Sequence, residues 1–328
     1  MSEARPPDDQ APRAKAAVPP RAGKGKGANR PRPGGGPVRS APPARGRQAR
    51  QAAHRRNRTY AILAVGAAVV IIVVVVAFSV SGGGGGAPRS PAPAAAVDQV
   101  NAITVSTLVE GNGRITPTTY ASTAAGGPLT QNGKPEVLFI GAEFCPICAA
   151  ERWPMTIALM KFGTFTNLGT THSAVSDGDA GTWTYYGSTY SSPYLSFVPK
   201  ELYTNQPSGS YYKTLEKLTN AEQAVWTANE GTNLAFPFID FGGQAVLESA
   251  QYNPQTIYYK SFSDILASVG SNNNTIGAQI NSAAAVFTKY LCNMTKDQPS
   301  SVCAAVAKVN APVTSSGNTG TSTPANGG

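Results

Sequence analysis

The sequence predicts an α/β domain, in which helices flank a mixed sheet, preceded by one transmembrane helix. Short apolar runs alternate with helix-forming stretches from residue 136 onward, which is typical of layered α/β domains. Residues 60–80 carry no charge over a length that can cross a bilayer. Cys145 and Cys148 follow the first buried strand and open the first long helix, so we expect the chemistry at that junction.

Residues 1–59 form a strongly basic segment. They hold 15 Lys and Arg against 3 Asp and Glu, a net charge of +12, whereas residues 60–328 carry −3. Because the segment has almost no large apolar side chain, we expect a disordered cytoplasmic tail. Its Lys and Arg side chains can contact anionic lipid head groups. Nucleic-acid binding is disfavoured, because no Phe, Trp or Tyr precedes Tyr60.

Residues 60–80 are expected to form a single transmembrane helix of roughly 31 Å. A signal peptide would have a shorter apolar region nearer the N-terminus, and a buried core helix fits poorly with a segment dominated by β-branched residues. Arg55, Arg56 and Arg58 precede the span, and positive residues remain in the cytoplasm. The N-terminus is therefore predicted inside, and the chain from about residue 81 outside, the cytoplasmic membrane.

Composition divides the rest of the chain into three parts. Residues 81–97 are rich in Gly, Pro and Ala and predict a flexible linker. Residues 98–310 are long enough for one compact domain. Residues 311–328 consist largely of Thr, Ser, Gly, Asn and Pro and predict a disordered tail.

The first half of the domain contains the expected buried strand. Residues 102–109 fit a strand or a short helix, and residues 136–140 fit a buried central strand. Residues 148–162 are good helix formers, interrupted by Pro154, which should kink the helix. Weaker strands are expected at residues 172–176 and 182–186, and a bent or edge strand around Pro199 at residues 194–203.

The second half predicts helix, hairpin and helix. Residues 211–230 fit a helix with a possible new start at Thr219. Residues 236–247 contain a proline, an apolar strand, a Gly-Gly turn and a second strand, which indicates a β-hairpin. Residues 276–293 show helical spacing of apolar side chains, and a loop with a shorter helix follows to residue 310.

The domain contains four cysteines, an even number that outside the cytoplasm favours pairing. The simplest pairing joins Cys145 to Cys148 and Cys292 to Cys303. The second pair encloses ten residues and predicts a structural disulfide between two short helical pieces. A relay of electrons to or from the first pair is the alternative role.

The spacing of Cys145 and Cys148 permits three uses. A redox pair, a structural disulfide and half of a zinc site all fit, but zinc needs four ligands and the domain offers only His172 as a histidine. Ala149 excludes the standard haem attachment motif. In the redox interpretation Cys145 lies exposed at the helix start, where free N–H groups stabilise its thiolate, and Cys148 resolves the mixed disulfide.

Residues 142–148, Ala-Glu-Phe-Cys-Pro-Ile-Cys, are similar to the thioredoxin-family active site, which also follows a buried strand. Phe236 and Pro237 resemble that family's cis-proline loop. The resemblance implies a thioredoxin-like fold in which these two residues face the cysteine pair and bind substrate. Phe139 stands where thioredoxin has a buried aspartate. Glu143 is the only nearby acid, and a solvated Glu143 would leave the proton path of Cys148 undefined.

The chain also resembles a narrower group, the membrane-anchored thioredoxin-like prokaryotic proteins of domain-of-unknown-function family 929. Residues 144–153, 187–194 and 236–240 carry this resemblance, and the Cys292/Cys303 arrangement fits it. It covers roughly residues 98–308. The tyrosine-rich stretch 182–194 could receive unfolded chains, but ordinary core packing is the favoured interpretation.

These observations predict a membrane-tethered, extracytoplasmic thiol–disulfide oxidoreductase that needs no bound cofactor or metal. Its partners would be protein thiols and disulfides outside the cytoplasm and a membrane redox partner. A non-catalytic binding or assembly module with two structural disulfides is one alternative, and zinc binding is another. The sequence leaves open whether the pair acts as oxidant, reductant or isomerase.

Overall fold

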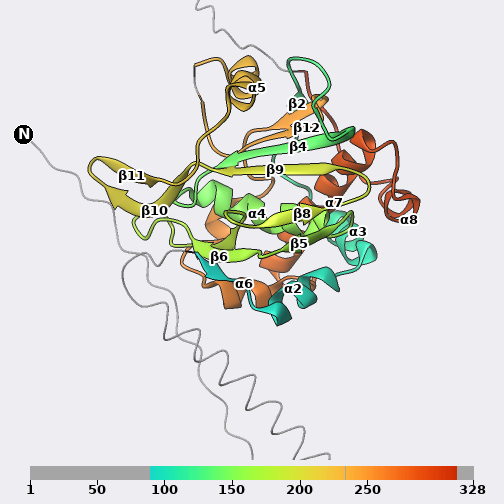
Figure 1. Cartoon of the computed structure of the whole chain (residues 1–328). Helices are drawn as coiled ribbons and strands as arrows, with labels where there is room; N and C mark the ends of the chain where they lie inside the picture. The colour runs from blue at the N-terminus through green and yellow to red at the C-terminus, as the bar shows by residue number, and fades with distance from the viewer. Residues whose placement is uncertain (1–88, 233, 316–328) are drawn as a thin grey trace, which may run out of the picture. The chain divides into compact units, whose positions relative to one another are not determined.

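A computed structural model describes residues 89–232 and 234–315 (Figure 1). The predicted basic tail, the predicted transmembrane helix at residues 60–80 and residues 81–88 of the predicted linker lie outside the described residues. Within the described residues, no helix has the length and apolar character needed to cross a membrane.

The prediction of an α/β domain with a mixed sheet is confirmed. The central strand β4 pairs in parallel with β9 and antiparallel with β12, and the sheet continues from β12 through β13 to β2. A short strand, β3, pairs with the start of β4. The strands are β2 (Ser122–Thr123), β3 (Thr130–Gln131), β4 (Lys134–Gly141), β9 (Ser196–Glu201), β12 (Phe238–Phe241) and β13 (Ala245–Leu247).

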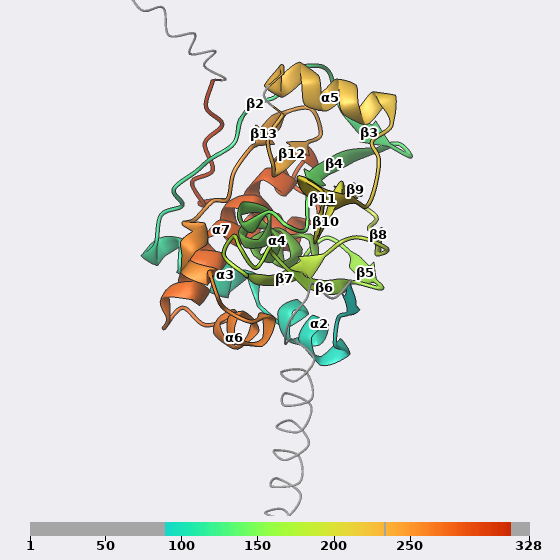
Figure 2. The same ribbon diagram turned by 90° about the vertical axis from the view of Figure 1, so that its left-hand side faces the viewer.

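Helices cover both faces of the sheet. Seven α-helices lie in the described residues: α2 (Ala94–Asn101), α3 (Val105–Arg114), α4 (Pro146–Leu159), α5 (Asn220–Glu230), α6 (Phe262–Ser268), α7 (Thr275–Met294) and α8 (Ser300–Ala305). Figure 2 shows α5 on one side of the sheet and α4 and α7 on the other. The arrangement explains why residues 137–140 of β4 are all apolar, since the part of a strand that is covered on both faces buries every side chain.

The burial of β4 follows this layering residue by residue. Val137 and Phe139 belong to the large core that α4 and α7 share, whereas Leu138 and Ile140 pack in a second core with Trp226 of α5. All four β4 side chains are fully buried. Successive strand residues point to opposite faces, so this single strand joins the two cores.

Two β-insertions extend the domain beyond the central sheet. Between α4 and β9, β5 (Thr164–Thr166) pairs with β8 (Thr189–Ser191), and β6 (Gly169–His172) pairs with β7 (Gly181–Thr184) and β1 (Ser90–Pro91). Between β9 and α5, β10 (Tyr203–Ser208) and β11 (Tyr211–Thr214) form a hairpin that projects from the body in Figure 1. A short 3₁₀ helix, η1 (Pro254–Ile257), precedes α6.

The prediction of a helix over residues 211–230 is wrong for its first part. Residues Tyr211–Thr214 form β11, because Gly209 adopts the positive φ of 62° that a tight hairpin turn requires and tyrosine and threonine favour strands. The helix α5 begins where Thr219 and Glu222 form a capping box. The predicted strand or helix at residues 102–109 is the helix α3.

The ordered domain is longer than predicted at both ends. The predicted linker ends earlier, because β1 pairs with β6 and α2 begins at Ala94, burying Ala96 and Val100. The predicted C-terminal tail begins later, because Thr314 pairs with Ser122 and the Tyr290 hydroxyl donates to the carbonyl of Pro312. Backbone pairing and buried apolar contacts hold these low-complexity segments, and composition alone does not reveal such contacts.

The disulfide between Cys292 and Cys303 joins α7 to α8, with an S–S distance of 2.05 Å. We expect the Cys292→Ala/Cys303→Ala variant to lower the free energy of unfolding by up to about 3 kcal/mol, because the closed loop is short. Denaturant unfolding measures this loss. Reactivity of the Cys145 thiol should stay unchanged, and a change in that reactivity would instead favour the relay role.

Candidate functional site

Cys145 stands between the end of β4 and the start of α4. It is the N-cap of α4, and its Sγ accepts a hydrogen bond from the N–H of Cys148 at 3.1 Å. Pro146 occupies the first turn, where a missing N–H costs little. The helix N-terminus therefore directs a backbone donor and the positive end of the helix dipole at the Cys145 sulfur, which stabilises a thiolate.

The expectation that Cys145 is exposed is wrong. Its exposed fraction is 6%, and Cys148 is fully buried; both are free thiols. The partly buried rings of Phe144, Tyr203 and Phe236 pack around the pair. Reaction with a protein substrate therefore requires this aromatic cover to move.

Phe236 packs against the cysteine pair, and Pro237 is the next residue along the chain. The peptide bond between them is cis. The Cys145 thiol donates to the carbonyl oxygen of Phe236 across 3.9 Å. Pro237 leads directly into β12, the antiparallel neighbour of β4. Their role in substrate binding stays a prediction.

The two thiols have opposite acidities. A hydrogen bond from the Cys148 thiol lowers the pKa of Cys145, and this effect outweighs the opposing effect of burial. Burial raises the pKa of Cys148 well above the ordinary value, and the nearby Cys145 raises it further. If the pair loses one proton, these directions predict that the remaining proton lies on Cys148, so Cys145 is the candidate nucleophile.

Charged side chains that sequence reasoning did not single out lie buried beside the pair. Arg152 and Glu201 form an ion pair at 2.6 Å, and both side chains are fully buried. Arg152 lies four residues after Cys148, one turn along the same helix. This spacing is the signal in the sequence that could have pointed to Arg152. Glu201 is 49 positions further along the chain, so only the fold brings the two together.

Glu143 is buried rather than solvated, with an exposed fraction of 2%. Its carboxylate accepts a hydrogen bond from Thr184 at 2.7 Å. Burial, reinforced by the charge of Glu201, raises the pKa of Glu143 to about 7. The site therefore contains a carboxyl group that titrates near neutral pH.

An aromatic cluster surrounds Phe144, next to the nucleophile. Its ring stacks on Tyr212 with centroids 4.1 Å apart and an interplanar angle of 7°. Tyr211 and Phe236 meet Phe144 edge-on at 5.5 and 6.2 Å. Tyr211 is 49% exposed. This cluster was not predicted from the sequence, because residues 211–230 were expected to form a helix.

The aromatic side chains of the stretch 182–194 pack in or against the core, except the exposed Tyr186. Trp183 and Tyr185 are buried there, and Trp183 packs against Trp153 of α4 at 5.4 Å. The favoured interpretation of this stretch as core packing therefore fits the structure. The aromatic rings beside Cys145 are instead those of Phe144, Phe236 and, from the β10–β11 hairpin, Tyr203. Cys292 and Cys303 belong to the large core, not to the cluster that contains Cys145 and Cys148.

Within the described residues, no group of three or more His, Cys, Asp or Glu side chains is placed to hold a metal ion.

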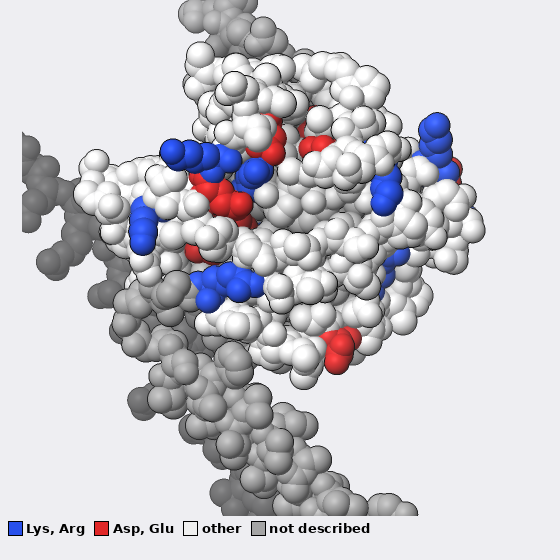
Figure 3. Space-filling model, viewed as in Figure 1, with Lys and Arg blue, Asp and Glu red and all other residues white. Residues whose placement is uncertain are grey.

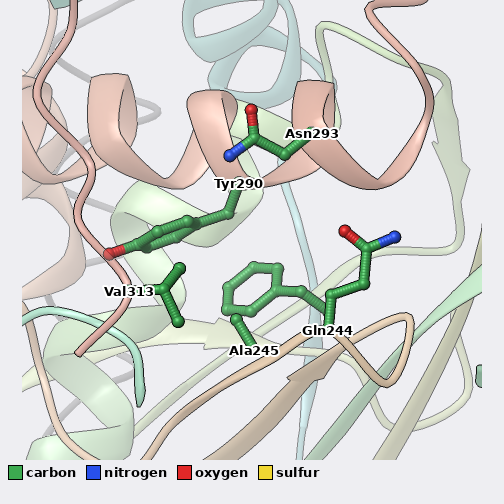
Figure 4. A pocket seen from close by; sticks show the side chains of 6 residues that line it. Gln244, Ala245, Tyr290, Asn293 and Val313 are labelled. Atoms are coloured by element: carbon green, nitrogen blue, oxygen red, sulfur yellow. The ribbon is translucent and has the colours of Figure 1, made fainter. Parts of the chain in front are cut away.

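A pocket of about 190 Å³ is open between β12, β13 and α7 (Figure 4), lined by Phe241, Gln244, Ala245, Tyr290, Asn293 and Val313. Its lining carries no charged side chain and includes neither cysteine of the candidate site.

The pKa of Cys145 can be tested by alkylation. Iodoacetamide reacts with the thiolate, so the rate at Cys145 should rise with pH and reach its midpoint below the ordinary 9.0. The Cys148→Ala variant loses the S–H donor but keeps the backbone N–H. We expect its midpoint to rise toward the ordinary value. Mass spectrometry identifies the alkylated residue, and a midpoint at or above 9.0 in the wild type would contradict the assignment.

Comparison with known proteins gives one match. The family model described as "Domain of unknown function (DUF929)" matches residues 121–209, which include β4, the cysteine pair and α4. No curated protein and no solved structure matches the chain. Over the matched residues, the chain is therefore similar to a family whose function is not defined.

Proposed function

We propose that this protein is a thiol–disulfide oxidoreductase with a thioredoxin-like domain, in which Cys145 attacks and Cys148 resolves. The observation that carries this proposal is the asymmetry of the two thiols at the start of α4. Backbone and thiol donors aim at the Cys145 sulfur, and the pKa of Cys145 is lowered while that of Cys148 is raised. A structural disulfide gains nothing from such an asymmetry.

The reaction balances without a bound cofactor. The Cys145 thiolate attacks one sulfur of a substrate disulfide, whose S–S bond breaks, and the other sulfur leaves as a thiolate. Cys148 then loses its proton and attacks Sγ of Cys145, which releases the second substrate sulfur. The substrate gains two electrons and two protons, and the cysteine pair is oxidised. The reverse sequence oxidises a substrate dithiol.

The thioredoxin-like assignment rests on the local arrangement. A buried strand, β4, leads into the cysteine pair at the start of α4, and a cis peptide bond before Pro237 faces the pair from the neighbouring strand. Phe236 and Pro237 are proposed to bind the substrate chain beside Cys145. The resemblance to the thioredoxin family supplies this role, and the 3.9 Å contact to Phe236 supports it.

The proposed location is the outer face of the cytoplasmic membrane. It rests on the uncharged residues 60–80 and the arginines before them. A membrane redox partner would then reset the cysteine pair. Figure 3 shows charged side chains of both signs scattered over a largely uncharged face, which favours protein chains over nucleic acid as partners.

One observation favours a second candidate function. Cys145 is almost fully covered by aromatic side chains, as expected of a non-catalytic binding module whose cysteines only support the fold. The two candidates differ in whether a substrate disulfide can reach the Cys145 sulfur.

The test is catalysis by the full-length protein in insulin reduction and in reoxidation of reduced ribonuclease. We expect activity in at least one assay, and its loss in Cys145→Ser because no other described thiol has a lowered pKa. The Cys292→Ala/Cys303→Ala variant is the matched control and should keep its activity. Equal inactivity of wild type and Cys145→Ser in both assays would favour the binding module.

A further inference from the structure

A buried cation lies one helical turn below the resolving cysteine. Arg152 and Cys148 are both on α4, four residues apart, and therefore share one face of the helix. Side chains on a helix lean toward its N-terminus, which directs Arg152 toward Cys148. Arg152 is fully buried, so water does not screen its charge from the cysteines.

The guanidinium group is fixed by three hydrogen bonds. Nε donates to Oε1 of Glu201 at 2.9 Å, and Nη2 donates to Oε2 of Glu201 at 2.6 Å. Nη2 also donates to the carbonyl of Ala142 at 2.9 Å. Glu201 is at the end of β9, and Ala142 directly follows β4. The planar fork of arginine suits this geometry, which a lysine cannot reproduce.

One nitrogen of Arg152 remains without a partner. Nη1 is buried and makes no hydrogen bond to any atom that the structure describes. Buried donors are normally satisfied, so an orphan donor beside a reactive group calls for an explanation. The charges that raise the pKa of Arg152 against the effect of burial are those of Glu201, Cys148 and Cys145. Glu201 is already paired, so the two cysteine sulfurs are the remaining negative charges that act on Arg152.

We propose that Arg152 is a positioning residue that stabilises the Cys148 thiolate in the resolving step, with Glu201 holding the guanidinium in place. This inference rests on the proposed function. When the resting pair loses one proton, the lowered pKa of Cys145 favours the negative charge on that sulfur. Once Cys145 is bonded to a substrate sulfur, Cys148 must give up its proton, and Arg152 compensates the charge that then forms on the buried Cys148 sulfur.

The step balances in atoms and electrons. Cys148 loses its proton, and its sulfur attacks Sγ of Cys145. The Cys145–Cys148 bond forms as the bond between Cys145 and the substrate sulfur breaks. The substrate sulfur leaves with the electron pair and takes up a proton. Arg152 keeps its own protons throughout and acts only through its charge and the Nη1 donor.

The other ionisable groups around Arg152 do not replace it. Glu143, after β4, is engaged with Thr184, and Glu201 is engaged with Arg152. Burial raises the pKa of Glu151 on α4 to about 8, and burial also raises the pKa of Tyr185, after β7. Cys145 and Arg152 are the charges that act on the pKa of Cys148, and Arg152 is the one that lowers it.

The test separates the two exchange steps in the full-length reduced protein. Dithiobisnitrobenzoate releases one coloured thiolate when Cys145 attacks and a second when Cys148 resolves. Removing Arg152 alone would leave the buried charge of Glu201 without a partner and strongly destabilise the fold. The informative variant is therefore Arg152→Met/Glu201→Met, which replaces the ion pair with apolar side chains of similar volume.

We expect this double variant to slow the second release by about tenfold, the equivalent of one pKa unit, and to slow the first release by less. The pH midpoint of the second release should rise by a similar amount, a change that a purely structural role for Arg152 would not produce. The matched control is Lys200→Met/Glu222→Gln. It removes the 3.4 Å ion pair between Lys200, the neighbour of Glu201 in the sequence, and Glu222. Glutamine at position 222 can still form the capping box of α5. Both releases should match the wild type in this control.

Three outcomes overturn the inference. An unchanged second release in the double variant would show that Arg152 does not act on Cys148, while leaving the proposed function intact. Equal slowing of both releases, with no shift in the pH midpoint, would assign Arg152 to the fold. Failure of the wild-type protein to release either thiolate would overturn the proposed function, and the inference with it.

Discussion

The buried ion pair between Arg152 and Glu201 joins the helix that carries the cysteines to the parallel edge strand of the sheet. Both side chains are fully buried. Such a pair repays its desolvation only when its geometry is good, and an apolar replacement of similar volume is often as stable. Stability alone therefore does not account for its presence. Its place below Cys148, with one guanidinium nitrogen unpaired, indicates a role in controlling the charge of the two sulfurs.

The aromatic cover adds a second constraint. Cys145 has the acidity of a nucleophile but hardly any exposure, because Phe144, Tyr203 and Phe236 pack over it. The β10–β11 hairpin supplies Tyr203 and the rings that stack on Phe144. In the proposed reaction, a protein substrate would reach Cys145 only after this hairpin or these rings are displaced. An apolar substrate segment could replace the aromatic contacts that displacement breaks.

The elements that the sequence predicted well are those with strong local signals. The apolar run of β4, the Gly-Gly turn between β12 and β13 and the helical spacing of α7 each specify their structure locally. The β10–β11 hairpin was missed because its strands carry tyrosines without clear alternation. The Arg152–Glu201 pair and the burial of Glu143 could not be predicted, since both depend on contacts between segments far apart in the chain.

The central claim is that Cys145 and Cys148 are a redox pair rather than a structural disulfide. Stabilising a thiolate favours the reduced form, which makes the couple more oxidising. Equilibration of the protein with thiol buffers of known potential tests this most directly. The account predicts a reduction potential for Cys145–Cys148 well above roughly −300 mV, the range of structural disulfides, and well above that of Cys292–Cys303. A potential as low as that of Cys292–Cys303 would contradict it.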